Sequence, residues 1–302
     1  MRPEIIIICG PTASGKSALS IELAKRLDTE IISADSLAIY KGLDIGTAKP
    51  SKDELCAVKH HLIDVCEPTD NFSVSDFESL ALPIIEDLLS RGKIPIICGG
   101  TGFYINSILY KLSYGGSASN LEVREKFYKM AEELGAQSVY DELLKVDPKS
   151  CEKIHQNDLV RVIRALEIYY STGKKKSEQN DKLCPRYTYL AVTPDIDRQA
   201  LYNRIDYRVD KMIESGLLEE VKGLIDGGID LNCQCMQGIG YKETYDAIVN
   251  DSYGDLAYQI KLNSRHYAKR QVTFFKKLDG IIKVPKDTNL AVEMILNIID
   301  KE

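Results

Sequence analysis

The sequence predicts an α/β fold, with a parallel β-sheet core covered by helices on both faces and a mostly helical insertion domain. Ile5–Cys9 and Ile94–Cys98 are short apolar runs of the kind that form buried strands, and stretches with helical periodicity lie between them, as in parallel β/α units. A glycine-rich turn joins the first run to the first helical stretch. After Leu112 the composition changes to a Ser/Gly-rich link, Ser113–Asn120, followed by charged amphipathic stretches, which predicts the insertion.

The composition is that of a globular protein with one or two domains. The 302 residues are 44% hydrophobic and 28% charged, and the formal net charge is -6, which still permits a local basic surface for RNA. No apolar run approaches the length of a membrane span, and Ile5–Cys9 is too short for a signal sequence. The spacing of Cys233 and Cys235 is too short for the usual zinc site. We therefore expect a cytoplasmic protein with reduced thiols.

The first turn has the sequence of a phosphate-binding P-loop, so the expected core is P-loop NTPase-like. Its residues are Gly10, Pro11, Thr12, Ala13, Ser14, Gly15, Lys16 and Ser17. The glycines let the backbone turn its N–H groups toward anionic oxygens, and the helix Ser17–Leu27 adds a partial positive charge. Lys16 supplies a full charge, and Ser17 offers a hydroxyl to Mg²⁺. The alternative is a chance match in a glycine-rich turn, which the flanking strand and helix disfavour.

Asp35 follows the next β-type run, Glu30–Ala34. Ligands of doubly wound sheets bind outside the carboxyl ends of the strands, so Asp35 is expected to face the same crevice as the P-loop. Capping of a helix that begins near Ser36 explains this residue equally well. His60 and His61 are adjacent and point to opposite faces of a strand, so we interpret them as structural or substrate-edge residues.

The strand Ile94–Cys98 ends in Gly99-Gly100-Thr101-Gly102. In most P-loop NTPases one such strand ends in an aspartate that orients Mg²⁺. The absence of that aspartate argues against a plain ATPase or GTPase. A Gly-Gly-Thr turn instead lets the backbone and one hydroxyl come close to a ligand.

Four helical stretches have apolar stripes that predict their buried faces. They are Phe72–Leu89 (Phe77, Leu80 and Ile84, with Ser75 as the candidate cap), Asn120–Asp147 (Val123, Phe127, Met130 and Leu134), Asp158–Tyr170 (Leu159, Val162, Ile163 and Leu166) and Asp197–Met212 (Leu201, Ile205, Val209 and Met212). The second and third lie in the insertion, residues 113–186. The strand Tyr187–Thr193 then returns the chain to the core, which comprises residues 1–112 and 187–302.

Basic residues mark two places in the C-terminal part of the chain. Arg204 and Arg208 lie four apart on one side of their helix, and spacing alone does not distinguish a solvated face from a side chain aimed at the phosphates. Leu256–Lys277 carries six Lys or Arg, no Asp or Glu, and four interleaved aromatic residues. This pattern favours contact with RNA, because the charges neutralise phosphates and the rings stack on bases.

Taken together, these segments make the sequence resemble the bacterial tRNA dimethylallyltransferases, also called tRNA isopentenyltransferases. The matching segments are Gly10–Ser17, Asp35–Pro50 (D-S-L-A-I-Y-K-G-L-D-I-G-T-A-K-P), His61–Asp64, Gly99–Tyr104, Asn157–Gly173, Gly238–Glu243 and Tyr267–Phe275 (Y-A-K-R-Q-V-T-F-F). They run in order along almost the whole chain. The resemblance implies transfer of a dimethylallyl group from dimethylallyl diphosphate to N6 of the adenosine 3′ of the anticodon in tRNA, which produces i6A.

The resemblance also implies roles for individual residues. The P-loop would hold the diphosphate of the prenyl donor, with Mg²⁺ as cofactor at Ser17. Asp35 would be the general base for N6, Lys16 and Arg208 would offset the charge of the leaving diphosphate, and Thr101 would lie near the reacting centre. The residues that would touch tRNA are Asp35, Ser36, Leu37, Ala38, Thr101, Arg124, Val160, Arg161, Val162, Ile163, Arg164, Gln237, Gly238, Ile239, Gly240, Tyr241, Lys242, Lys269 and Arg270.

The insertion would clasp the anticodon stem of the tRNA, and we expect a monomer that does not bind membranes. Two positions depart from the commonest pattern of the family. Ala38 lies where many members have Gln, and Phe274 replaces a usual Trp. Neither departure touches the phosphate chemistry.

Three alternatives stay open at this point. An adenylate isopentenyltransferase would share the P-loop and Asp35 but would not need the basic segment Leu256–Lys277. A P-loop nucleotide kinase or RNA-binding NTPase would leave Asp35 and Gly99–Gly102 unexplained. An RNA-binding module with an inactive P-loop is the non-enzymatic alternative.

Overall fold

The sheet of this protein is parallel throughout, as the sequence predicts. The computed structural model describes residues 2–116, 120–179 and 184–301. They divide into two compact units, one comprising Met1–Leu109 with Pro185–Glu302 and the other Tyr110–Cys184. Part of the predicted Ser/Gly-rich link, residues 117–119, lies outside the described residues. Among the described residues, no helix combines the length and apolar character that a membrane span needs.

The first unit contains one six-stranded sheet with the order β3-β2-β4-β1-β5-β6. The strands are β1 (Ile5–Cys9), β2 (Ile31–Ser33), β3 (His60–His61), β4 (Ile96–Gly99), β5 (Tyr189–Pro194) and β6 (Ile282–Val284). In the register, Ile7 lies beside Ile97 of β4 and Ile6 beside Leu190 of β5. All five residues of β1 are buried, because this strand is central and helices cover both of its faces.

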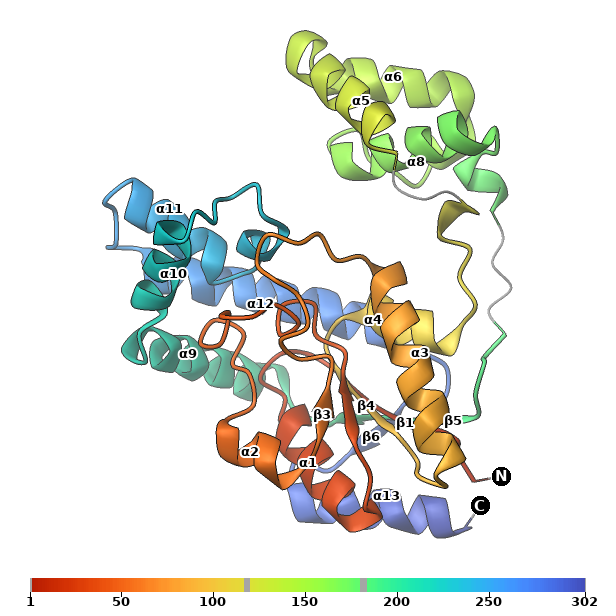
Figure 1. Ribbon diagram of the computed structural model, residues 1–302, viewed down its shortest axis with the longest axis vertical. Coiled ribbons are helices and arrows are strands. Elements are labelled where there is room, and N and C mark those ends of the chain that lie inside the picture. Colours follow the sequence, from red (N-terminus) through yellow and green to blue (C-terminus); the bar gives the residue numbers. More distant parts are fainter. Residues whose placement is uncertain (1, 117–119, 180–183, 302) are drawn as a thin grey trace. The chain divides into compact units, whose positions relative to one another are not determined.

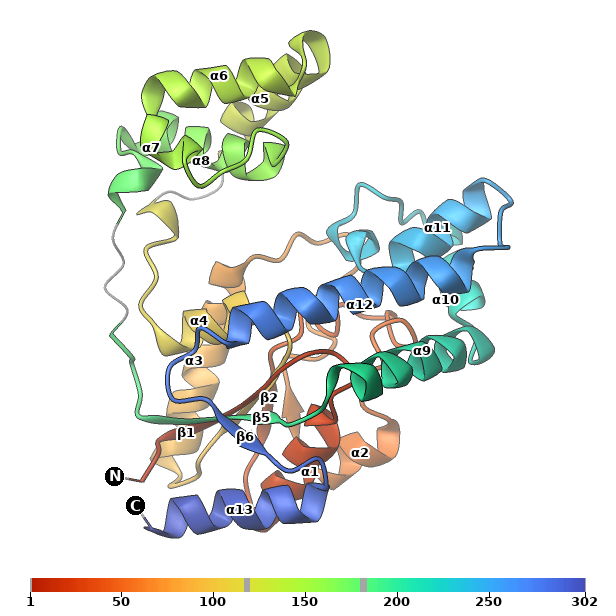
Figure 2. The same ribbon diagram turned by 180° about the vertical axis from the view of Figure 1, so that it is seen from behind.

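Helices cover both faces of this sheet, so the predicted α/β class is confirmed. The helices of this unit are α1 (Lys16–Leu27), α2 (Lys52–Ala57), α3 (Val74–Ser90), α4 (Gly102–Leu109), α9 (Arg198–Glu214), α10 (Leu217–Asp226), α11 (Tyr241–Val249), α12 (Leu256–Phe275) and α13 (Thr288–Lys301), with a short 3₁₀ turn η3 (Gln234–Gln237). Leu19 and Leu23 of α1 and Ile295 of α13 pack on Ile6 and Ile8 of β1. Figures 1 and 2 show α3 and α4 on the opposite face.

The buried faces of α9 and α3 test the predicted apolar stripes. In α9 the buried residues are the four predicted ones, Leu201, Ile205, Val209 and Met212. In α3 they are Phe77, Ala81, Ile85 and Leu88, whereas Leu80 is 42% exposed. The choice of Leu80 and Ile84 was therefore wrong. The helix is apolar on several sides, so periodicity alone did not identify its inner face. Its N-cap is Ser73, in a capping box with Asp76, and not Ser75.

The second unit is helical and has its own core. Its elements are η1 (Tyr114–Gly116), α5 (Leu121–Leu134), α6 (Ala136–Val146), α7 (Pro148–Cys151), α8 (Leu159–Thr172) and η2 (Lys176–Glu178). Phe127, Val139, Leu143, Val162 and Leu166 form its centre. Leu134, which was predicted to be buried, is 69% exposed at the C-terminus of α5, because Gly135 ends the helix there.

Candidate functional site

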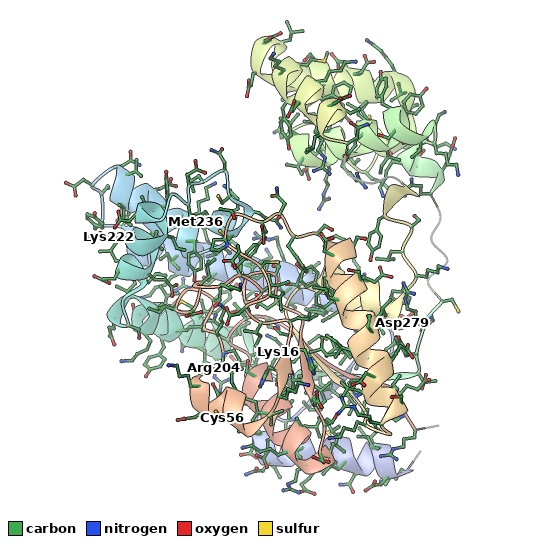
Figure 3. All side chains as sticks on the ribbon, in the orientation of Figure 1. Lys16, Cys56, Arg204, Lys222, Met236 and Asp279 are labelled. Carbon is green, nitrogen blue, oxygen red and sulfur yellow. The ribbon has the colours of Figure 1, made fainter. Side chains whose placement is uncertain are left out.

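A cavity of about 760 Å³ opens at the carboxyl ends of the central strands. This volume is typical of small-molecule sites. The phosphate loop, the turn after β2, the loop 46–50, the turn after β4 and helices α9 and α12 all contribute to its wall. Figure 3 labels Lys16 and Arg204, which both line this cavity.

The phosphate loop has the geometry of an anion cradle. Gly10 and Gly15 adopt φ values of 141° and 99°, which L side chains rarely adopt. In the part of the chain that the structure describes, the backbone N–H groups of Ala13, Gly15, Lys16 and Ser17 have no acceptor, and the buried hydroxyl of Ser14 has no partner. Groups of this kind need acceptors, and an anion with several oxygens would supply them.

Lys16 lies inside this loop. Its Nζ donates to the carbonyl of Pro11 at 2.6 Å. Burial lowers the pKa of Lys16, and the charge of Asp35 partly offsets that effect. An ammonium group that is partly shielded from solvent interacts more strongly with an anion than a fully exposed one does.

Asp35 faces the cavity, and it holds a turn where the alternative expectation was a helix N-cap. Its Oδ1 accepts hydrogen bonds from the N–H groups of Leu37 at 2.9 Å and Ala38 at 3.3 Å, so it holds a turn, although the turn does not continue as a helix. The same side chain lines the cavity together with Lys16. No described residue donates to Oδ2, which leaves that oxygen available to a substrate.

Thr101 joins this turn to the end of β4. Its Oγ1 accepts from the N–H of Ser36 at 3.1 Å, and its own N–H donates to the carbonyl of Ala34 at 3.1 Å. Through these two hydrogen bonds, Thr101 positions the residues on both sides of Asp35.

Ala38 is only 5% exposed, so the departure from Gln at this position places a methyl group in the cavity wall.

The two arginines of α9 both face the phosphate loop. Arg208 donates from Nη1 to Oγ1 of Thr12 at 3.1 Å and from Nη2 to the carbonyl of Thr47 at 2.9 Å. Arg204 approaches the carbonyl of Ser14 at 3.4 Å. A solvated face therefore describes neither side chain. Burial lowers the pKa of Arg208 and the charge of Asp35 raises it, so the guanidinium and the carboxylate influence each other across the cavity.

Two residues of α12 at this site were not selected from the sequence as site residues. Gln271 is buried and bonds to the phosphate loop through Thr12. Tyr267 lines the cavity, and burial and the charge of Asp35 raise its pKa to about 12. Both lie within the segment Tyr267–Phe275 that carried the resemblance. Their contacts reach residues far away in the chain, so spacing offered no signal.

The expected tRNA-contacting residues in the C-terminal part of the first unit differ in their positions. Gln237, Gly238 and Ile239 line the cavity. Lys242, Lys269 and Arg270 are exposed, and Arg270 also lines the cavity. Tyr241 is fully buried and donates from its hydroxyl to Glu220 at 2.6 Å, so the structure assigns it a packing position and not an exposed one.

The basic face of α12 is smaller than the count of charges predicts. Lys261 pairs with Asp210 of α9 at 2.6 Å, and Arg265 pairs with Asp206 through Nε at 2.9 Å. These two cations hold α9 against α12. Lys269 remains exposed, so its charge is available to a polyanion.

In the second unit only some of the expected residues reach the surface. Val160 is 66% exposed and the side chain of Arg161 is 67% exposed. Val162 and Ile163 are core residues at 0% and 2% exposure, because they lie on the inner face of α8.

Arg124 and Arg164 are occupied by an internal partner. Glu167 is fully buried and accepts from Nε of Arg124 at 2.9 Å, from Nη1 of Arg164 at 2.5 Å and from the N–H of Asn120 at 2.7 Å. A buried carboxylate requires such partners. These two arginines therefore hold α5 and α8 together in this structure.

Near the phosphate loop, the hydroxyl of Ser17 is the oxygen that the sequence predicted as a ligand of magnesium. Among the described residues there is no group of three or more His, Cys, Asp or Glu side chains that could hold a metal. Ser17 lines the cavity at the start of α1. Mg²⁺ typically keeps several waters and binds through one or two protein oxygens plus substrate phosphates.

Comparison with known proteins agrees with the resemblance seen in the sequence. The sequence model of the IPP transferase family matches residues 38–278, and that of the isopentenyl transferases matches residues 3–69. The chain is 46% identical over 297 residues to the tRNA dimethylallyltransferase of Acetivibrio thermocellus, covering 97% of this chain and 95% of the relative. It is 48% identical over 282 residues to that of Bacillus cereus, covering 92% and 89%.

Two solved structures are similar over the whole chain. The tRNA isopentenylpyrophosphate transferase of Bacillus halodurans superposes with a TM-score of 0.74 at 40% identity and covers 98% of this chain and 95% of that one. A eukaryotic dimethylallyltransferase acting on tRNA gives a TM-score of 0.84 at 33% identity, with coverage of 98% and 78%.

Proposed function

This chain belongs to the IPP transferase family, and we propose that it transfers a dimethylallyl group from dimethylallyl diphosphate to N6 of the adenosine 3′ of the anticodon in tRNA. The family and the enzyme class expected from the sequence are confirmed. The observation that supports this reaction most directly is that the phosphate loop and the carboxylate of Asp35 line the same cavity.

The residues of this cavity account for both the bond that breaks and the bond that forms in an alkyl transfer. The bond between C1 of the dimethylallyl group and the diphosphate oxygen breaks, and a bond between C1 and N6 forms. The proton of N6 passes to the Oδ2 side of Asp35, and diphosphate departs with the bonding electron pair. An exocyclic amine is a weak nucleophile, so a carboxylate placed within hydrogen-bond reach of it accelerates the step.

The anion cradle of the phosphate loop would stabilise the negative charge that develops on the leaving diphosphate. Lys16, Arg208 and the loop with its free N–H groups line the same cavity, and groups that are already in place would need little reorganisation during the reaction. We propose that Ser17 contributes one ligand to Mg²⁺, which would neutralise further phosphate charge when bound. Arg208 also contacts Thr47 and so holds the opposite wall of the cavity.

We further propose that the tRNA is held at two surfaces. One is the exposed part of α12 with Lys269 and Arg270, and the other is the exposed face of the insertion with Val160 and Arg161. The target base must leave the anticodon loop to enter the cavity. Because phosphate contacts release counterions, binding at these surfaces should weaken steeply with salt.

The test is prenylation of an unmodified tRNA by the purified protein with Mg²⁺ and labelled dimethylallyl diphosphate, followed by mass spectrometry of the nucleosides. Asp35→Ala should cut the single-turnover rate by about 10²–10⁴-fold while tRNA affinity stays nearly constant. Asp53→Ala, at an exposed position of α2, is the matched control.

Two outcomes would contradict the proposal. Equal turnover of free AMP and tRNA would indicate a nucleotide prenyltransferase. RNA-stimulated ATP hydrolysis without prenylation would indicate an NTPase.

A further inference from the structure

Gln271 of α12 makes one hydrogen bond to each side of the cavity. Its side chain is buried, with 5% exposure. The amide oxygen accepts from the N–H of Thr12 at 2.9 Å, and the amide nitrogen donates to the carbonyl of Gly100 at 3.0 Å. These two partners lie 259 and 171 positions away in the chain.

The partner on the first side belongs to the phosphate loop. Thr12 is held at its N–H by Gln271 and at its hydroxyl by Arg208. Thr12 is thus fixed at two atoms by two different helices, α12 and α9. Its N–H is also withdrawn from the anion cradle, because Gln271 already occupies it.

The partner on the second side is connected to Asp35, the proposed general base. Gly100 precedes Thr101, whose N–H donates to Ala34 and whose hydroxyl accepts from the N–H of Ser36. Ala34 and Ser36 flank Asp35 in the chain. The phosphate loop is therefore connected to the turn that carries the carboxylate by hydrogen bonds at Gln271 and Thr101 and by the peptide bond between Gly100 and Thr101.

The fit around this amide is close. A Cβ atom at Gly100 would lie 2.2 Å from Nε2 of Gln271, so the absence of a side chain there lets the amide reach the backbone. The site requires an acceptor for one N–H and a donor for one carbonyl, on one neutral side chain. An amide provides both at any pH, whereas a carboxyl group of the same length provides both only when it is protonated.

We propose that Gln271 is a positioning residue that sets the separation between the phosphate loop and the two connected turns that carry Asp35 and Thr101. It thereby aligns the leaving diphosphate with the nitrogen that displaces it. The inference rests on the proposed function, because alignment matters only if leaving group and base act on one substrate pair. Alkyl transfer is sensitive to such placement, since small displacements of reacting atoms slow it strongly.

The experiment compares Gln271→Met and Gln271→Glu with the unsubstituted protein. Single-turnover prenylation of tRNA is measured across pH, and binding of inorganic diphosphate is measured by calorimetry. Gln271→Met should lower the single-turnover rate at least about ten-fold at every pH. Diphosphate affinity should change less than about three-fold, because the Gln271 side chain is neutral and contributes no charge to the anion cradle.

Gln271→Glu supplies a result that loss of folding stability cannot imitate. A protonated carboxyl group both donates and accepts, like the amide, whereas a carboxylate cannot donate to Gly100. Burial raises the pKa of such a carboxyl group. The rate of this variant relative to the unsubstituted protein should therefore be highest at low pH and fall as pH rises, while the ratio for Gln271→Met stays flat.

Gln259 lies on the same helix and is exposed, so Gln259→Met and Gln259→Glu are matched controls that should leave the rate unchanged. An unaffected rate in Gln271→Met, a parallel loss of diphosphate affinity, or a flat ratio in Gln271→Glu would each overturn the inference. If Gln271→Met fails to fold, the pH profile of Gln271→Glu decides. An unsubstituted protein without prenylation would overturn the proposed function, and the inference with it.

Discussion

Glu220 of α10 holds the loop that forms one wall of the cavity, and replacing it by Gln tests how that wall is fixed. Its Oε2 accepts from the N–H groups of Asp44 at 2.9 Å and Ile45 at 2.8 Å. Its Oε1 accepts from the N–H of Gly46 at 3.2 Å and from the hydroxyl of Tyr241 at 2.6 Å. One carboxylate therefore satisfies four donors.

An amide cannot do the same. If the amide nitrogen of Glu220→Gln replaces Oε2, the bonds from Asp44 and Ile45 are lost. If it replaces Oε1, the bond from Gly46 is lost and the Tyr241 hydroxyl must accept instead of donate. Either way, hydrogen bonds to an ionised acceptor are lost. Each such bond contributes about 1.5–3 kcal/mol. Water can reach the N–H of Asp44, which is exposed, and offsets part of the loss. We expect the free energy of unfolding to fall by about 2–4 kcal/mol.

The substitution should also slow the reaction, although Glu220 does not line the cavity. Gly46 and Thr47 do line it, and Arg208 donates to the carbonyl of Thr47. If the loop shifts, Arg208 loses its alignment with the phosphate loop. We expect the single-turnover rate to fall about ten-fold.

Urea unfolding and single-turnover prenylation measure these two effects. Glu219→Gln is the control, because Glu219 lies in the same first turn of α10 and is exposed. It loses the same charge near the helix N-terminus, which is a small effect. Equal losses of stability in the two variants would refute the argument from hydrogen bonds.

Three further predictions concern other parts of the molecule. Arg208→Lys should lower the single-turnover rate about 10²–10³-fold, because a lysine cannot bridge both loops, whereas Arg204→Lys loses only one long contact and should have a smaller effect. Burial opposes ionisation of Glu30, but hydrogen bonds from Arg91, His61 and Lys59 lower its pKa to about 2 from 4.5. Its contribution, about 3 kcal/mol, is therefore complete above pH 4.5 and lost as pH falls toward 2. The free energy of unfolding measured across pH should fall less steeply below pH 4.5 in Glu30→Gln than in the unsubstituted protein. Glu167→Ala should destabilise the insertion by about 3–5 kcal/mol, because two arginines lose their buried partner; hydrogen exchange should then accelerate in α5 and α8 and not in α1.

Some features of this protein could be predicted from the sequence because they depend on near neighbours in the chain. The apolar strand β1, the glycine-rich turn and α1 follow one another directly, so their order and spacing were sufficient to predict a phosphate loop. The stripe of α9 recurs at helical spacing and was predicted in full. The face of α3 was not, because several of its sides are apolar. The family was recognised from motifs that are short and local.

Other features were decided only by tertiary packing. Spacing could not show that Arg208 bridges Thr12 and Thr47, which lie 196 and 161 positions away. The resemblance implied that Tyr241 and Arg164 contact tRNA; in the fold, Tyr241 is buried and Arg164 pairs with Glu167. Gln271 looked like any polar residue of a basic helix. The sequence alone determined which local elements form and which chemistry they carry. The structure decided which side chains meet, because each meeting depends on how helices and strands distant in the chain pack, and local periodicity does not record that.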